Sequence, residues 1–293
     1  MAIIDEIKTS FKTGNNLVKL LYINVAVFLA VTLIEVLFTL FQVSPDFSIV
    51  RILSVPSDLG ILITRPWSLF TYMFLHANFL HILFNMLWLF WFGQIFLQYL
   101  DQKKLLSVYI LGGFSGAALY ILAFNLFPLF ASSVQQSVAL GASASVVAIV
   151  VAISFYVPNN TINLMFIGPV KLKYIALFTI VLDILSITSS NAGGHIAHLG
   201  GALFGYMYIQ QYKKGNNISR GFDRFMDNLF GWFKKRENIT VTHKQKRPQT
   251  DIEYNRNRAK NQKEIDRILE KIAKSGYDSL SKSEKETLFK ANQ

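Results

Sequence analysis

Several polar side chains interrupt the apolar stretches of this 293-residue sequence, and their types are those that catalyse acyl transfer. A serine oxygen is a weak nucleophile until a neighbouring base takes its proton, and histidine suits that role near neutral pH. Amide and imidazole N–H groups stabilise the oxyanion that forms next. The residues that offer these groups are Ser143, His195, His198, His81 and Asn85. Together they predict a serine nucleophile, a histidine base and side-chain donors to an oxyanion.

The composition indicates that these residues lie in membrane-spanning segments. Hydrophobic residues make up 52% of the chain and charged residues 16%, whereas a soluble domain has about 25% charged residues. A transmembrane helix needs about 20 mainly apolar residues. The segments that approach or meet this length are 17–42, 79–100, 104–127, 138–157, 171–189 and 193–212. The sequence therefore predicts an all-α polytopic membrane protein with a six-transmembrane-helix bundle over 17–212.

Basic residues in the short loops indicate the orientation of this bundle. With six spans, the N-terminal segment 1–16, the turn between spans 2 and 3, the loop between spans 4 and 5 and the tail share one side. Their basic residues before the tail are Lys8, Lys12, Lys103, Lys104, Lys171 and Lys173. The opposite side carries only Arg51 and Arg65. Since cytoplasmic loops are rich in Lys and Arg, both termini are predicted to be cytoplasmic, in a protein of the bacterial inner membrane.

This topology brings the polar residues to one depth. Spans 2, 4 and 6 all run from outside to inside, and Ser143 lies about six residues into the fourth, a depth of about 9 Å at 1.5 Å per residue. Small residues on the fourth and sixth spans, including Gly201 and Gly205, permit close approach of the two backbones. A hydroxyl and an imidazole are therefore expected to meet in the outer third of the membrane.

Simpler interpretations apply to each residue taken alone. A serine in an alanine-rich helix commonly bonds to its own turn, and a buried histidine commonly has a structural hydrogen bond. The main rival is a metal site, since four histidines could converge: His76, His81, His195 and His198. The sequence has no cysteine and no His-Glu-x-x-His pattern. The joint occurrence of serine, histidine and asparagine at one depth favours acyl transfer without metal or cofactor.

Three motifs give the sequence a resemblance to the rhomboid intramembrane serine proteases over about residues 60 to 210. They are RPWSLFTYMFLHANFLHILFN at 65–85, GASAS at 141–145 and AHLGGALFG at 197–205. The resemblance implies a rhomboid-like six-helix core in which Ser143 is the nucleophile and His198 the general base. It further assigns oxyanion stabilisation to His81 and Asn85. His195 is a neighbour one turn from His198, and His76 and Gly141 are supporting residues.

The sequence departs from the family pattern at three positions. Ser68 follows the loop tryptophan where arginine is common, and Gln98 stands near a usual glutamate. Val147 occupies a position that commonly holds an aromatic residue stacked on the catalytic histidine, which leaves the support of His198 open. Asp183, near the outer end of the fifth span, and Glu35 in the first are expected to make structural hydrogen bonds, with Asp183 alternatively close to the site.

The resemblance implies an intramembrane serine endopeptidase that works through a Ser143–His198 dyad. Its substrates would be single-span or other membrane proteins, cleaved in a transmembrane segment near the outer end. Water would reach the site through a cavity that the polar side chains of spans 2, 4 and 6 create. The alternative is a catalytically inactive rhomboid-like protein that binds membrane clients. The presence of both Ser143 and His198 favours the enzyme.

The tail beyond the sixth span is strongly basic. Residues 213–293 contain 20 Lys and Arg and 11 Asp and Glu, a net charge of +9 out of the chain's +11. Segment 213–236 has the pattern of an amphipathic helix, either on the anionic membrane surface or packed beneath the bundle. Segment 237–260 is expected to be a polar linker, and 261–293 a helical hairpin that resembles a C-terminal module of some bacterial rhomboid-like proteins. No nucleic-acid motif occurs in it, and its partner is not identified.

Overall fold

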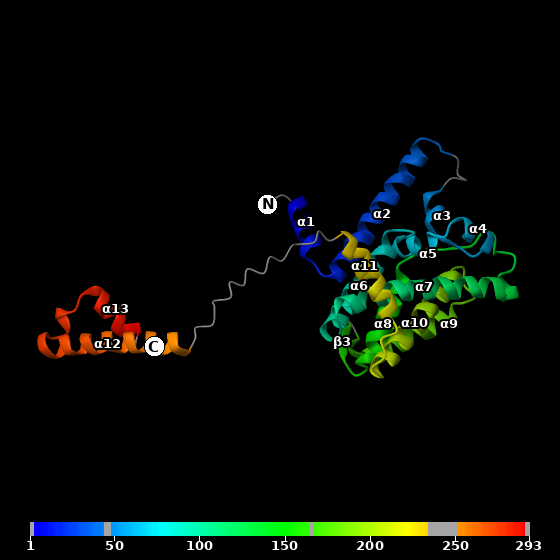
Figure 1. Cartoon of the computed structure of the whole chain (residues 1–293). Helices are drawn as coiled ribbons and strands as arrows, with labels where there is room; N and C mark the ends of the chain where they lie inside the picture. Colours follow the sequence, from blue (N-terminus) through cyan, green and yellow to red (C-terminus); the bar gives the residue numbers. More distant parts are fainter. Residues whose placement is uncertain (1–2, 44–47, 165–166, 234–250, 291–293) are drawn as a thin grey trace. The chain divides into compact units, whose positions relative to one another are not determined.

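The computed structural model describes residues 3–43, 48–164, 167–233 and 251–290, which are mostly helical (Figure 1). The chain divides into two compact units, residues 1–234 and 235–293. The first unit holds the helices that the sequence predicts to cross the membrane. The second holds the C-terminal helices.

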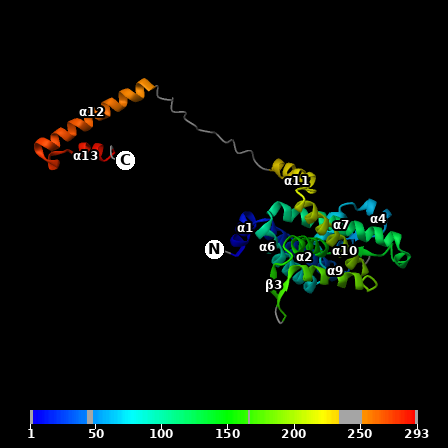
Figure 2. The same ribbon diagram turned by 90° about the horizontal axis from the view of Figure 1, so that it is seen from below.

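The elements of the first unit follow the predicted segments closely. Its helices are α1 (Ile3–Thr13), α2 (Asn16–Leu40), α3 (Ile49–Leu53), α4 (Leu59–Thr64), α5 (Ser68–Thr71), α6 (Phe79–Tyr99), α7 (Gln102–Leu126), α8 (Ser143–Tyr156), α9 (Leu172–Leu185), α10 (Ala192–Lys213) and α11 (Arg220–Phe233), with short 3₁₀ helices at Tyr72–Phe74 and Pro128–Phe130. Strands β1 (Val55–Pro56) and β2 (Val138–Ala139) form one antiparallel pair, and β3 (Thr161–Leu164) and β4 (Gly168–Lys171) form another. The β3–β4 hairpin projects from the bundle in Figure 2.

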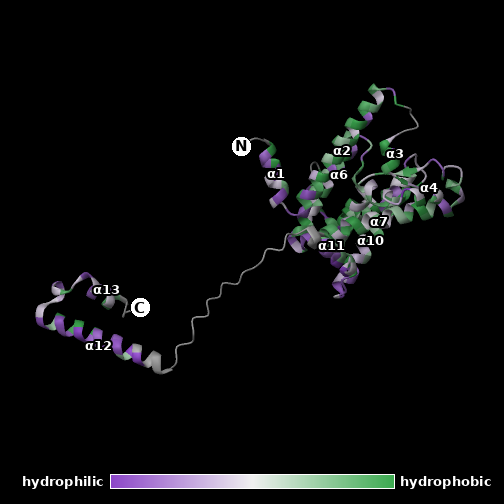
Figure 3. Cartoon of the chain, turned by 45° about the horizontal axis from the view of Figure 1, so that its top comes forward, coloured by the Kyte–Doolittle hydropathy of each residue, from purple (hydrophilic) through white to green (hydrophobic). Residues whose placement is uncertain are grey.

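The expected all-α polytopic membrane fold is confirmed. Among the described residues, α2, α6 and α7 are long and apolar enough to cross a membrane. The other predicted spans correspond to α8 and α9, each of 14 residues, and to α10, whose 22 residues include several glycines. Figure 3 shows how strongly apolar α2 and α6 are, and large side chains such as Leu33 and Phe178 are exposed on the outside of the bundle. The chain is an integral membrane protein.

Side-chain caps fix where three of these helices begin. The side-chain oxygen Oδ1 of Asn15 accepts from the backbone N–H of Val18 at α2, and Oδ1 of Asn78 accepts from that of His81 at α6. The Asp101 carboxylate caps α7 in the same way. Each cap satisfies one of the four N–H groups that a helix start leaves free. The cap at Asn78 therefore sets the first turn of α6, which carries His81.

Helix α8 lies at the centre of the bundle, and most of its side chains are buried. It packs against α6, α7, α9 and α10, and α10 makes its largest contacts with α7 and α8. A Cβ at Gly201 would lie 2.1 Å from the Ala144 carbonyl oxygen, and one at Gly205 would lie 2.3 Å from that of Ala148. Only glycine permits backbones to approach this closely. The predicted contact of the two small-residue faces is therefore present.

The start of α8 differs from the sequence prediction. The fourth span was expected from residue 138, with Ser143 some six residues into it, but residues 138–139 form β2 paired with β1, and the helix begins at Ser143 itself. Gly141 has φ +135°, and its N–H donates to the Tyr72 carbonyl. A helix cannot run through that conformation. Ser143 therefore lies in the first turn of α8, at the end of an extended segment.

Helix α11 is attached to α7 by polar contacts. The Ser107 hydroxyl donates to Asp223 at 2.5 Å, and the Lys103 ammonium pairs with Asp227 at 2.7 Å. Phe222 packs against the core, whereas Phe225 is 60% exposed. The helix thus packs on the bundle through one face and leaves apolar side chains such as Phe225 exposed on another. Its contact with the membrane surface stays a prediction.

The second unit consists of two helices joined by a tight turn. They are α12 (Asp251–Ser275) and α13 (Lys282–Lys290), with a 3₁₀ turn at Tyr277–Ser279. Gly276 adopts φ +75° between them, and Ile268 and Leu280 are buried. Residues 237–250 of the expected linker lie outside the described residues, and from Asp251 onward the chain is helical, earlier than the predicted hairpin.

A capping box and an ion pair hold α13 in place. The Ser281 N–H donates to the Glu284 carboxylate at 2.7 Å, while the Glu284 N–H donates to the Ser281 hydroxyl at 3.3 Å. Lys271 of α12 pairs with the same carboxylate at 2.9 Å. The Ser281 N–H and the Lys271 ammonium lower the pKa of Glu284 from 4.5 to about 2. Ionised Glu284 thus serves both the helix start and the contact between the helices.

Replacing Glu284 with Gln is expected to loosen α13 in a pH-dependent way. A carboxyl with a lowered pKa contributes stability above its unfolded value and loses that contribution as the pH falls through the folded value. Amide hydrogen exchange in α13 should therefore be faster in Glu284→Gln than in the original chain at pH 7. The difference should shrink below pH 4.5 and disappear near pH 2. A difference that persists at pH 2 would contradict this account.

Candidate active site

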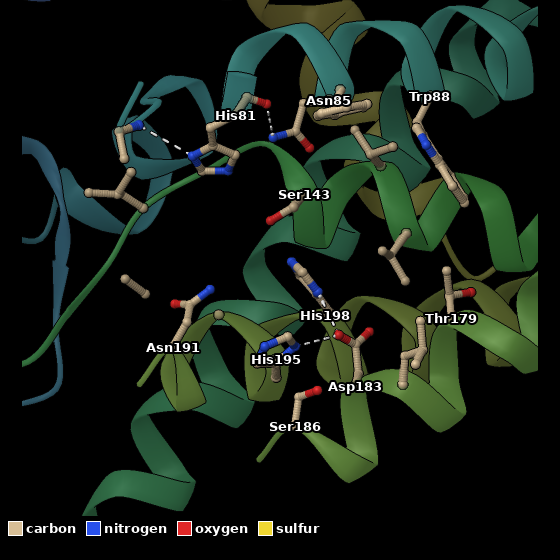
Figure 4. A pocket seen from close by; sticks show the side chains of 18 of the residues that line it. His81, Asn85, Trp88, Ser143, Thr179, Asp183, Ser186, Asn191, His195 and His198 are labelled. Atoms are coloured by element: carbon tan, nitrogen blue, oxygen red, sulfur yellow. Dashed lines mark hydrogen bonds and ion pairs between the residues drawn. The ribbon is translucent and has the colours of Figure 1, made fainter. Parts of the chain in front are cut away.

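A pocket of about 830 Å³ opens among α6, α8, α9 and α10. Figure 4 shows α6 on one side of it and α9 and α10 on the other, with the start of α8 between them. Its lining is mainly apolar. The polar side chains in it include those of His81, Asn85, Ser143, Asp183, His195 and His198. The pocket therefore contains all five side chains on which the sequence prediction of catalysis depends, together with Asp183.

Ser143 is placed by the turn that precedes it. A Cβ at Gly141 would lie 3.1 Å from Nε2 of His81 and 3.3 Å from Oγ of Ser143. The missing side chain therefore leaves a small space between these two groups. In the part of the chain that the structure describes, the Ser143 hydroxyl has no hydrogen-bond partner, and Figure 4 shows it directed into the pocket. Its backbone N–H belongs to the first turn of α8, where helical N–H groups have no partner within the helix.

Hydrogen bonds orient the two residues on α6. The Ala77 N–H donates to Nδ1 of His81 at 3.2 Å. A neutral imidazole that accepts at Nδ1 carries its proton at Nε2, so Nε2–H of His81 is a donor. The Asn85 amide donates one N–H to the His81 carbonyl at 3.0 Å, which leaves its second N–H available. Both side chains line the pocket next to Ser143.

A buried carboxylate joins the two histidines of α10. Nδ1 of His195 lies 2.8 Å from Oδ1 of Asp183, and Nδ1 of His198 lies 2.9 Å from the same oxygen. A carboxylate only accepts hydrogen bonds, so each Nδ1 that bonds to it carries the proton. The Asp183 residue is only 6% exposed. In Figure 4, His198 lies between Ser143 and Asp183. The arrangement can hold a neutral imidazole with Nε2 free to accept a proton.

The sequence alone did not reveal this pairing. The sequence predicts a mainly structural role for Asp183. Its hydrogen-bond partners lie on another helix, and local sequence does not indicate how α9 packs against α10. The available signal was its position, since an acidic residue in an apolar helix of a membrane protein usually faces a polar cavity or a partner. The structure shows that it is both hydrogen-bonded and in the pocket.

His76 lies behind His81 and outside the pocket. It is 7% exposed, and its ring contacts that of His81 edge-on, with centroids 5.1 Å apart. Neither of its nitrogens has a partner among the described residues. The group of possible ligands that the described residues bring together is therefore Asp183, His195 and His198, without His76 or His81. Asp183, His195 and His198 offer ligand atoms within 4.8 Å of one another, but the two hydrogen bonds account for this spacing without an ion.

These features define the class of the protein: an integral membrane helix bundle with a serine, histidines and an asparagine around one pocket. Comparisons with known proteins agree. The Rhomboid domain family matches residues 64–213, which are 150 of the 293 residues. The chain belongs to the rhomboid family. Residues 249–290 match a family of unknown function (DUF6576), which covers the helices of the second unit.

A curated relative is also similar. The chain is 31% identical over 160 residues to the RHOMBOID-like protein 12, mitochondrial, of Arabidopsis thaliana. The match covers 52% of this chain and 48% of the relative, so the chain spans about half the length of the curated relative it matches. Because of this partial coverage, the similarity supports the family membership and does not define an activity.

Replacing Gly141 with Ala is expected to destabilise the fold by about 1–3 kcal/mol, because φ +135° is strained for a residue with a Cβ. The measurement is thermal unfolding of the purified protein in detergent. Gly221→Ala in α11 is the matched control, since a Cβ there meets nothing within 4 Å and alanine favours a helix. Equal unfolding temperatures for Gly141→Ala and the original chain would show that this turn is not constrained as described.

Proposed function

We propose that the chain is an intramembrane serine endopeptidase with Ser143 as nucleophile and His198 as general base. The observation that carries the proposal is the hydrogen-bond partner of Nδ1 in each of the two flanking imidazoles: a carboxylate for His198 and a backbone N–H for His81. His198 uses Nδ1–H toward Asp183 and so presents an acceptor to the pocket, while His81 accepts at Nδ1 and so presents a donor. A serine protease needs these opposite roles beside its nucleophile.

The reaction would proceed by two acyl-transfer steps. Ser143 attacks the scissile carbonyl while Nε2 of His198 takes the hydroxyl proton. The oxyanion receives hydrogen bonds from Nε2–H of His81, the free amide N–H of Asn85 and the backbone N–H of Ser143. His198 then protonates the leaving amine, and a water molecule activated by the same imidazole hydrolyses the acyl-enzyme.

The pocket lining supports an apolar, membrane-embedded substrate. Side chains of α6 and α9 form its walls, and those at its edge remain exposed, with Leu80 60%, Phe84 58% and Leu182 44% accessible. The edge of α6 and α9 is therefore the natural place for a transmembrane segment of another protein to dock. A peptide bond held in a helix must be exposed before attack, so segments with weak helical ends should be the better substrates.

The contacts at one end of the bundle support the proposed topology. The Asn16 N–H at the start of α2 donates to the Gln102 side chain at the start of α7, and Lys103 pairs with Asp227 of α11. The N-terminal, second-to-third and C-terminal segments thus share one side, as the loop charges predict. The proposal places this side in the cytoplasm of a bacterial cell and the pocket in the outer part of the membrane.

The alternative function is a catalytically inactive client-binding protein of the same family. An apolar pocket between α6 and α9 would serve that function equally well. It would not require a hydroxyl with an acceptor on one side and oriented donors on the other. These groups favour the enzyme.

The proposal is tested by cleavage of a labelled single-span substrate in liposomes. Ser143→Ala and His198→Ala are expected to lower the cleavage rate by at least about 10³-fold, because each removes a member of the nucleophile–base pair. Ser145→Ala is the matched control: Ser145 lies two residues along the same helix, is buried, does not line the pocket, and its hydroxyl has no partner among the described residues. That variant should cleave like the original chain.

A chelator distinguishes this mechanism from metal catalysis. Cleavage is expected to be unchanged in excess EDTA, since no step uses a cation. Cleavage that survives Ser143→Ala would contradict the nucleophile assignment. Loss of cleavage with His195→Ala but not with His198→Ala would reverse the choice of base.

A further inference from the structure

We propose that Asp183 is a positioning residue for His198, so that the site works as a serine–histidine–aspartate triad whose carboxylate comes from α9 and also holds His195. This inference rests on the proposed function. Asp183 does not touch the reacting atoms and acts only through His198. The proposal gives a role to a buried charged group that the serine–histidine pair leaves unused.

The carboxylate of Asp183 is buried and has two histidine side chains as hydrogen-bond partners. It lies in the last turn of α9, is 6% exposed, and its Oδ1 lies 2.8 Å from Nδ1 of His195 and 2.9 Å from Nδ1 of His198. An ionised carboxylate inside an apolar bundle is costly unless hydrogen bonds compensate for the lost water. His195 and His198 supply these bonds. The pairing is therefore specific to the packing of α9 against α10.

The carboxylate determines which nitrogen of His198 carries the proton. An ionised carboxylate only accepts hydrogen bonds, so Nδ1 of His198 must be the donor and Nε2 the acceptor. This is the tautomer that a general base requires when Nε2 faces the nucleophile. The negative charge also stabilises the imidazolium that forms when His198 takes the Ser143 proton.

Among the described residues, the His198 ring has Asp183 as its hydrogen-bond partner and an edge-on contact with the ring of His195, with centroids 5.9 Å apart. Val147 lines the same pocket and offers only methyl groups, in contrast to an aromatic residue that would stack on the imidazole. The backbone of α10 is fixed by the close approach of Gly201 to Ala144, but this contact does not fix the rotation of the ring. The hydrogen bond to Asp183 supplies that restraint.

His195 has a distinct role in this arrangement. It lies three residues before His198 and therefore on the same face of α10, and it donates to the same oxygen. The second hydrogen bond fixes the carboxylate between the two rings. His195 thus supports Asp183, and its loss should affect the reaction less than loss of Asp183.

The first test is the kinetics of the full chain in liposomes. Asp183→Asn keeps the size of the side chain but removes its charge and adds an N–H₂ group that can donate to Nδ1 and so favour the wrong tautomer. The expected result is a kcat lowered by about 10- to 100-fold, with KM changed less than about twofold and the unfolding temperature retained. His195→Gln should lower kcat by less. Asp58→Asn, at a helix cap that does not line the pocket and that asparagine can replace, is the matched control and should cleave normally.

The second test determines the tautomer of His198 by NMR and needs no substrate. The chain has five histidines, so the ring ¹⁵N signals of a histidine-labelled sample in micelles can be assigned with single variants. At a pH where the rings are neutral, His198 should carry its proton at Nδ1 in the original chain and lose this preference in Asp183→Asn. Asp183→Ala, measured in the same way, should also lose it.

The proposal would be overturned by an unchanged kcat in Asp183→Asn and Asp183→Ala, or by a His198 ring protonated at Nε2 in the original chain. A fall in kcat only in proportion to a loss of folded protein would also overturn it, because Asp183 would then be structural. Absence of cleavage by the original chain, with the Nδ1–H tautomer present, would instead count against the proposed function and leave the pairing of Asp183 with His198 established.

Discussion

The close contact between α8 and α10 determines where the polar groups of this bundle meet. Gly201 and Gly205 lie against the carbonyls of Ala144 and Ala148, at distances that leave no space for a Cβ. Such contacts are favoured in membranes, where van der Waals packing contributes strongly to helix association. Ser143 precedes Ala144, and His198 lies one turn before Gly201. The same packing that joins the helices therefore brings the hydroxyl and the imidazole into one pocket.

Most polar groups in this pocket are oriented by hydrogen bonds within the chain. Nδ1 of His81 accepts a backbone N–H, the Asn85 amide donates to a backbone carbonyl, and the two histidines of α10 share one carboxylate. Unpaired polar groups are costly in an apolar environment, so each bond stabilises the fold. Each bond also leaves a defined donor or acceptor free. Stability and chemical orientation thus have the same origin here.

The sequence predicted the helices well because apolar length is a strong local signal. It also predicted the residues of the pocket, because His81, Asn85, Ser143 and His198 follow from polar interruptions and from motifs. It did not predict that α8 begins at Ser143, since the extended segment before it depends on pairing of Ala139 with Val55, more than 80 residues away. Pairings between distant segments are not encoded in local periodicity.

The role of Asp183 shows the same limit. Its position in an apolar helix marked it as unusual, but its partners lie on the next helix, and which side of α9 faces α10 depends on tertiary packing. Val147 left the support of His198 undefined in the sequence. The structure places a carboxylate 2.9 Å from that imidazole, so the support comes from α9. The start of α12 differs from expectation for a simpler reason: residues 251–260 are mostly polar and lack the apolar pattern that indicates a helix over the residues that follow.

The central claim is that the hydroxyl of Ser143 is an activated nucleophile. It is tested most directly by treating the purified full chain in micelles with a fluorophosphonate probe and locating the adduct by mass spectrometry. The account predicts one adduct, on Ser143, that is absent in Ser143→Ala and strongly reduced in His198→Ala. No adduct on Ser143 in folded protein, or equal labelling of Ser143 with and without His198, would contradict it.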